Sequence, residues 1–205
     1  MIAIIDYDAG NIKSVEKALI SLGEDVVVTR DEQTILGADG VILPGVGAFG
    51  DAMEKLHSYG LVDVIKKCVA NKIPFLGICL GLQLMFESSE EAPGVEGLHI
   101  LDGKILRIPA EEGLKIPHIG WNNLTFPNEG RLFKGLKENS FVYFVHSYYL
   151  KAADEAIVKA TTEYGTCIHA SVEKDHVFAC QFHPEKSSEV GMKILQNFIE
   201  VTKER

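Results

Sequence analysis

The sequence predicts an α/β protein with a mostly parallel central sheet flanked by helices and an antiparallel strand extension in the C-terminal half. In the first half, apolar runs end in glycine-containing turns and lead into helix-like segments, which is typical of a parallel sheet covered on both faces. After about residue 100 the pattern changes to short strands joined by turns. No repeat or linker divides the chain, so we expect one domain over 1–205.

The first half contains three units of the same kind, each an apolar strand followed by a turn and a helix. The strands are expected at 2–6, 41–43 and 74–78, and the helices at 12–22, at 49–56 and from about 80 to 86. In the first helix the apolar residues recur at helical spacing, which predicts one face buried against the sheet.

The second half is expected to add six short strands and a closing helix. The strands are expected at 101–108, 123–126, 141–144, 156–160, 167–173 and 177–182. The helix is expected from about 190 to 202, where Met192, Ile194, Leu195, Phe198 and Ile199 form an apolar stripe.

Composition excludes several classes of function. A formal net charge of −9 argues against nucleic acid as the main partner, because phosphate binding needs a basic surface. No run of 18 apolar residues predicts a membrane span, and the N-terminus lacks a basic leader. The four cysteines are scattered without a CxxC pair, which indicates neither a disulfide framework nor a zinc site. We therefore expect a cytoplasmic protein that holds no metal and no cofactor.

The candidate nucleophile is Cys79, in the sequence Gly77-Ile78-Cys79-Leu80-Gly81 between a strand and a helix. Such a tight turn holds the nucleophile in a strained backbone conformation, and glycines two positions away on either side avoid a clash. The start of the following helix favours a thiolate, and the Leu80 amide points to where an oxyanion would form. The alternative is a buried structural cysteine. The remaining thiols are expected to be core or structural ones: Cys68, Cys167 and Cys180.

A thiol nucleophile needs a base, and the base needs a group to orient it. His183 follows an apolar strand, where the active sites of α/β proteins collect, and Glu185 two residues later faces the same side of an extended segment. Four other histidines are expected to be surface residues: His57, His99, His169 and His176. The remaining two, His118 and His146, lie in richer sequence surroundings, at 116–122 and 143–148.

Residues 45–50 spell G-x-G-x-x-G between a strand and a helix, which on its own would suggest a dinucleotide site. The unit is not the first of the sheet, however, and the next strand ends in the cysteine turn rather than in a ribose-binding acid. We therefore expect no nucleotide here.

The order Cys79, His183, Glu185 resembles the class I glutamine amidotransferases, in which an elbow cysteine and a C-terminal His-x-Glu form the triad. The resemblance covers nearly the whole chain. It implies a flavodoxin-like glutaminase that hydrolyses L-glutamine to L-glutamate and ammonia through a cysteine thioester. It also implies that the Pro44–Gly47 loop supplies a second oxyanion amide, so that Gly47 and Leu80 form the oxyanion hole. Glycines on both sides of Val46 leave the intervening peptide free to rotate, and this offers a switch.

Segments 5–11, 116–122, 143–148 and 181–187 are similar to the glutaminase subunits of imidazole glycerol phosphate synthases. This resemblance implies a heterodimer in which ammonia passes to a separate cyclase subunit of barrel fold. That subunit would make imidazole glycerol phosphate and aminoimidazole carboxamide ribotide in histidine biosynthesis.

The same resemblance implies roles for further residues. Gln83 and Glu91 would bind glutamine, together with the backbone at Ser147 and Tyr148. The residues implied at the partner interface are Asn11, His118, Trp121, Asn122 and Lys186. Other interpretations remain: a surface amide for Gln83, a solvated acid for Glu91 and a core anchor for Trp121.

Three other functions compete with this one. Glutaminases serving pyridoxal phosphate or anthranilate synthesis share the chemistry and differ in partner. A stand-alone peptidase or deglycase of the cysteine-elbow superfamily generally lacks the far C-terminal His-x-Glu pair, which is present here. A regulatory or chaperone module would be favoured only if the triad residues were dispensable.

Overall fold

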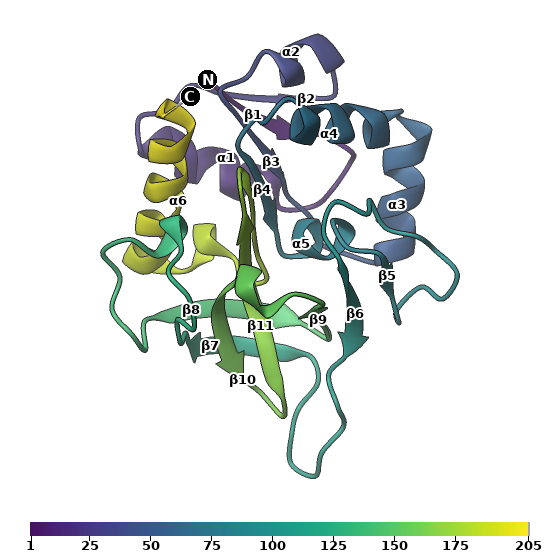
Figure 1. The fold of residues 1–205 in the computed structure, drawn as a ribbon, viewed down its shortest axis with the longest axis vertical. Coiled ribbons are helices and arrows are strands. Elements are labelled where there is room, and N and C mark those ends of the chain that lie inside the picture. Colours follow the sequence, from purple (N-terminus) through teal and green to yellow (C-terminus); the bar gives the residue numbers. More distant parts are fainter. Residues whose placement is uncertain (205) are drawn as a thin grey trace.

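The computed structural model describes residues 1–204. At its centre is a seven-stranded sheet in the order β10-β11-β12-β4-β3-β1-β2 (Figure 1). The strands are β1 (Ile2–Ile5), β2 (Val26–Thr29), β3 (Gly40–Leu43), β4 (Phe75–Ile78), β10 (Val158–Glu163), β11 (Cys167–Lys174) and β12 (Val177–Cys180). The strands from β12 to β2 are parallel to their neighbours, whereas β11 and β10 join antiparallel. The predicted fold class is confirmed.

Helices cover both faces of this sheet. They are α1 (Ile12–Ser21), α2 (Glu32–Leu36), α3 (Phe49–Ser58), α4 (Leu61–Ala70), α5 (Leu80–Leu84) and α6 (Ser188–Lys203). Successive side chains of a strand point to opposite faces, so Ile2 and Ile4 pack with α1 and α6 while Ala3 and Ile5 pack with α2, α3 and α4. In residues 1–204 no helix is long and apolar enough to span a membrane.

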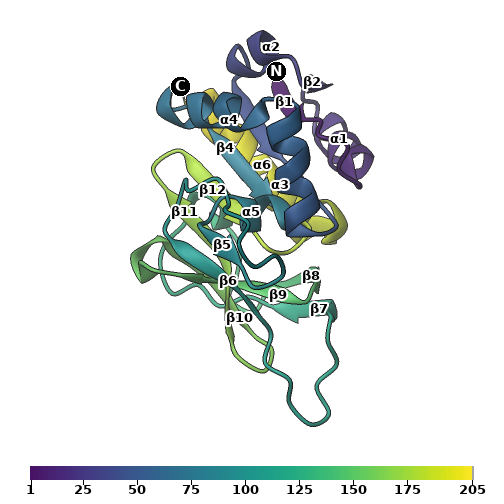
Figure 2. The same ribbon diagram turned by 90° about the vertical axis from the view of Figure 1, so that its right-hand side faces the viewer.

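Two small sheets lie beyond the main one. The first contains β5 (Ser88–Ser89), β6 (Gly103–Arg107) and β9 (Tyr148–Ala152), and the second pairs β7 (His118–Asn123) with β8 (Phe141–His146). Figure 2 shows both gathered at the end of the molecule away from α2 and α4. Short 3-10 turns complete the chain: η1 (Arg131–Phe133), η2 (Glu155–Ile157) and η3 (Pro184–Lys186).

The structure corrects the sequence prediction around Trp121. We expected a strand at 123–126, but the strand is β7, His118–Asn123. Thr125 forms only an isolated bridge with Thr161. Glycine and asparagine are poor strand formers, so β7 exists because it pairs along its whole length with β8, including Trp121 opposite Tyr143.

Candidate active site

Cys79 lies at the sharp turn between β4 and α5. Its backbone angles, φ 55° and ψ −109°, are strained for a residue with a side chain. A Cβ on Gly81 would stand 1.9 Å from the carbonyl oxygen of Leu43, and one on Gly77 would stand 2.6 Å from the sulfur of Met85. The two glycines are therefore required by close packing across the turn, as the sequence predicts.

His183 and Glu185 form a buried pair beside this turn. The Nδ1 atom of His183 lies 2.7 Å from Oε1 of Glu185, and both side chains are buried. Glu185 follows His183 in the 3-10 turn η3 and not in an extended segment, so the predicted contact arises from a different local structure. Asn11 donates a second hydrogen bond to Oε1 of Glu185 at 2.5 Å.

The surroundings of His183 favour its charged form. Burial alone would lower the pKa of His183, but the neighbouring Cys79 and Glu185 outweigh burial and raise that pKa to about 9. The Nε2 atom is buried and makes no hydrogen bond of ordinary geometry within residues 1–204. Catalytic hydrogen bonds are often loose without substrate, so Nε2 remains available as the proton carrier for Cys79.

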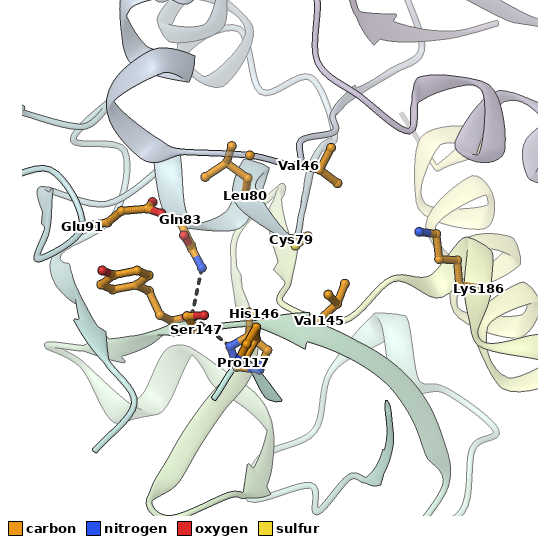
Figure 3. Close-up of a pocket in the computed structure, with 12 residues that line it drawn as sticks. Val46, Cys79, Leu80, Gln83, Glu91, Pro117, Val145, His146, Ser147 and Lys186 are labelled. Carbon is orange, nitrogen blue, oxygen red and sulfur yellow. Dashed lines mark hydrogen bonds between the residues drawn. The ribbon is translucent and has the colours of Figure 1, made fainter. Parts of the chain in front are cut away.

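A cavity of about 400 Å³ opens over Cys79 (Figure 3). Leu80, Gln83 and Glu91 lie on one side of it, and Val145, His146 and Ser147 lie on the other. Every residue predicted to bind glutamine or the oxyanion lines this cavity: Gly47, Leu80, Gln83, Glu91, Ser147 and Tyr148. Tertiary structure therefore brings these separate segments to one place.

Gln83 and Glu91 are both tied into the structure. Gln83 is buried and donates through Nε2 to the Tyr148 carbonyl and to Oε1 of Gln181, each at 3.0 Å. Oε2 of Glu91 accepts from the Phe49 amide at 2.9 Å, where α3 begins. Gln83 is therefore not a surface amide, and Glu91 is not a freely solvated acid.

The predicted oxyanion loop contacts the cysteine turn directly. The Leu80 amide donates to the Gly45 carbonyl at 3.3 Å. The Tyr7 hydroxyl donates to the Pro44 carbonyl at 2.7 Å and fills the space that a side chain on Gly45 would need. Gly47 has φ +105°, a conformation that favours glycine. In this state the loop itself occupies the Leu80 amide.

The residues implied at the interface fall into different environments. Trp121 is 51% exposed, which excludes a core role. It shares one side of the β7–β8 sheet with Ile119 and Phe141, which are 59% and 54% exposed. Lys186 lines the cavity. His118, by contrast, is buried between the rings of Tyr164 and Phe144, so its side chain offers no surface to a partner.

Two further expectations are wrong. His169 is buried and accepts a hydrogen bond from the Ala152 amide at 3.1 Å, although we expected a surface residue. Cys167 is exposed, although we expected a core or structural thiol. Both lie on β11, which is covered on both faces from Ile168 to Val172 and leaves only its ends more open, and Cys167 is its first residue.

Two contacts at the site have no counterpart in the sequence prediction. Gln181 is buried, and its Nε2 lies 3.7 Å from the sulfur of Cys79. A signal was present, because an amide that ends an apolar strand two residues before His183 is costly to bury without partners. The support of Glu185 by Asn11 joins residues 174 positions apart, and no local pattern indicates it.

Comparison with known proteins agrees with this geometry. The family model described as "Glutamine amidotransferase class-I" matches residues 3–201. The chain is 51% identical to imidazole glycerol phosphate synthase subunit HisH of Moorella thermoacetica, over 98% of this chain and 95% of the relative. It is 52% identical to the HisH subunit of Aquifex aeolicus, over 95% and 94%.

Among solved structures, a crystal structure titled glutamine amidotransferase superimposes with a TM-score of 0.77. It covers 99% of this chain and 100% of the other chain at 20% identity, which supports the fold alone. A family match over nearly the whole chain, together with relatives about half identical in sequence, leads to one conclusion: the chain belongs to the class-I glutamine amidotransferases.

Proposed function

We propose that this chain is the glutaminase subunit of an imidazole glycerol phosphate synthase. It hydrolyses L-glutamine to L-glutamate and ammonia and passes the ammonia to a cyclase subunit of barrel fold, in histidine biosynthesis. The observation that carries the chemistry is a strained cysteine that lines a cavity and lies beside a buried His–Glu pair. The named relatives, similar along their whole length, favour this synthase over those of pyridoxal phosphate or anthranilate synthesis.

The reaction follows from the positions of the groups. The sulfur of Cys79 attacks the side-chain amide carbon of glutamine, and the carbonyl oxygen becomes an oxyanion held by the amides of Gly47 and Leu80. His183, protonated at neutral pH, gives its proton to the leaving nitrogen, so ammonia departs and a γ-glutamyl thioester remains. His183 then takes a proton from water, which attacks the thioester and releases glutamate and the thiolate.

The thioester predicts selective labelling. Treatment with a glutamine-like electrophile is expected to place a single adduct on Cys79. Burial raises the pKa of the Cys68 thiol to about 11. Partial desolvation and the neighbouring Glu163 raise the pKa of the exposed Cys167, so both thiols stay protonated at neutral pH. Peptide mass spectrometry locates the adduct. Labelling of Cys68 or Cys167 in place of Cys79 would refute the assignment.

The β7–β8 sheet offers a docking surface for the cyclase subunit. Ammonia released into neutral water is mostly protonated and no longer nucleophilic, so the chemistry calls for an enclosed route to a second subunit. Trp121, Ile119 and Phe141 give the sheet an exposed apolar side, and the backbone of β8 also holds the amide of His183 through the Tyr143 carbonyl at 3.0 Å. Co-purification that identifies the synthase subunit tests this partner most directly.

Replacing Trp121 by alanine is expected to weaken the complex by about 2 kcal/mol or more, because exposed tryptophans at interface centres are typical hot spots. Calorimetric titration with the cyclase subunit measures the change. Ile20→Ala on α1 is the matched control, since Ile20 is 54% exposed but lies outside the β7–β8 sheet. Unchanged affinity of a folded Trp121→Ala variant would remove Trp121 from the interface.

The Pro44–Gly47 loop is proposed as the switch of this reaction. While the Gly45 carbonyl accepts from the Leu80 amide, that amide is already occupied and cannot serve the oxyanion fully. Val46 and Gly47 line both the active-site cavity and a smaller one of about 170 Å³, so there is open space next to the peptide that would rotate. The isolated chain is therefore proposed to be a poor glutaminase.

The free cysteines of the chain suit a reducing cytoplasm.

A further inference from the structure

The carbonyl oxygen of Tyr148 fixes the direction of several buried hydrogen bonds. It lies 3.0 Å from Nε2 of Gln83 and 2.9 Å from Nδ1 of His146. Dashed lines in Figure 3 mark these two hydrogen bonds. A carbonyl can only accept hydrogen bonds. Gln83 must therefore turn its NH₂ group to this oxygen, and His146 must carry a proton on Nδ1.

The orientation of Gln83 also determines the orientation of Gln181, next to the nucleophile Cys79. The NH₂ group of Gln83 also lies 3.0 Å from the side-chain amide of Gln181, so the atom of Gln181 on that side must be its oxygen. The NH₂ group of Gln181 then faces the sulfur of Cys79, 3.7 Å away. Gln181 is fully buried and its backbone amide is held by Ala170, so this orientation has no freedom to relax into solvent.

In the other direction the bonds lead to β7. Burial lowers the pKa of His146 to about 3, so the ring is neutral and its Nε2 can only accept. It accepts from Nδ1 of His118, 3.0 Å away. The pKa of His118 is lowered to about 4, also by burial, so its own Nε2 is an acceptor and faces Nδ2 of Asn122 at 3.4 Å. The same NH₂ group donates to the Glu163 carbonyl at 3.0 Å, which confirms its orientation.

We propose that the hydrogen bonds from the Tyr148 carbonyl through Gln83 make Gln181 a positioning residue that donates a hydrogen bond to the Cys79 thiolate. Together with the arm from the same carbonyl to Asn122, they form the Asn122–Cys79 relay. Its members are Asn122, His118, His146, the Tyr148 carbonyl, Gln83 and Gln181. The relay rests on the proposed function only in taking Cys79 as the nucleophile. It ties the donor at the sulfur to β7, the strand that carries Trp121.

Gln181 supplies something that the titratable neighbours of Cys79 do not. Tyr7 uses its proton on the Pro44 carbonyl. Burial raises the pKa of Cys180 well above its ordinary value, and His183 gives its proton away during the reaction. An amide donor keeps its protons throughout, so Gln181 can stabilise the sulfur whenever it is negative.

The hydrogen bond from Gln181 to Cys79 is tested by alkylation of Cys79 with iodoacetamide. The whole chain is alkylated, and peptide mass spectrometry measures the rate at Cys79. Gln181→Glu keeps the acceptor for Gln83 but turns an oxygen to the sulfur, and Gln181→Met removes both contacts. Alkylation at pH 7 is expected to slow about tenfold or more in both, most in Gln181→Glu, because a hydrogen bond to a charged group is worth about one pKa unit or more. Alkaline pH should restore the rate, which a packing defect would not do.

Ser171→Ala is the matched control, because it removes a buried hydrogen bond to Ala179 on the β11–β12 pair without touching the relay. Its alkylation rate should equal that of the unchanged chain. Folded Gln181 variants that react as fast as the control would overturn the proposal. The assay uses neither glutamine nor partner, so its outcome is independent of whether glutamine is the substrate.

A second measurement needs no variant. Nitrogen-15 chemical shifts of the imidazole rings distinguish the two neutral tautomers in the unchanged chain. We expect His118 and His146 to be protonated at Nδ1 and to show no titration between pH 5 and pH 8. Protonation of His146 at Nε2 would remove its hydrogen bond to the Tyr148 carbonyl and overturn the link of the relay to β7.

Discussion

Replacing Cys79 or His183 by alanine is expected to lower glutamine hydrolysis by about 10⁶-fold, and Glu185→Gln by about 10⁴-fold, by comparison with other triads. In the proposed mechanism Cys79 and His183 make and break bonds, so nothing replaces them. Glu185 is proposed only to orient the imidazole, and a glutamine there still presents an oxygen to Nδ1 of His183 and to Asn11. Glutamate release in the presence of the loaded partner measures all three variants.

Cys167→Ser is the control for these variants, because Cys167 is an exposed thiol outside the cavity and its loss should leave turnover unchanged. Thermal unfolding separates a catalytic defect from a folding defect. A folding defect has to be excluded for Glu185 in particular, because Oε2 of Glu185 is buried without a hydrogen-bond partner in residues 1–204. If the three triad variants were equally inactive while folded, Glu185 would do more than orient His183.

Binding of an acceptor analogue to the cyclase subunit is expected to raise glutamine hydrolysis by at least about 10²-fold, because losing one oxyanion donor typically costs about 10²–10³ in rate. In the structure the Gly45 carbonyl accepts from the Leu80 amide, so the chain alone lacks a free donor there. Rotation of the loop would release Leu80 and turn an amide toward the cavity. The comparison is between the chain alone, the chain with partner, and the chain with partner and an acceptor analogue.

Gly47→Ala tests the same loop from within. A Cβ at this position would meet no atom within 4 Å, but φ +105° is strained for alanine, so the variant should change the balance between loop states without a clash. The stimulation by the partner is expected to change, while the unfolding temperature changes little. Full glutaminase activity of the unchanged chain alone would mean that the loop is already set, and the switch would be withdrawn.

The sequence by itself determined the fold class and indicated the proposed triad, because both depend on short-range patterns. A strand must leave room for the helix that follows it, so Gly77 and Gly81 mark the turn at Cys79 in the sequence as clearly as in the structure. His183 and Glu185 are two residues apart, so their contact needed no knowledge of the tertiary fold. The strand was missed at β7 because Gly120, Asn122 and Asn123 disfavour strands and outweigh Ile119 and Trp121.

Only the tertiary structure decided how distant polar groups meet. Asn11 donates a hydrogen bond to Glu185 across 174 positions of the chain. His118, predicted at the interface, instead lies in the interior and contacts His146. The physical reason is the cost of burying a polar group without a partner. This cost is met by whichever group the packed sheets bring within about 3 Å, and strand register, not sequence spacing, decides which group that is.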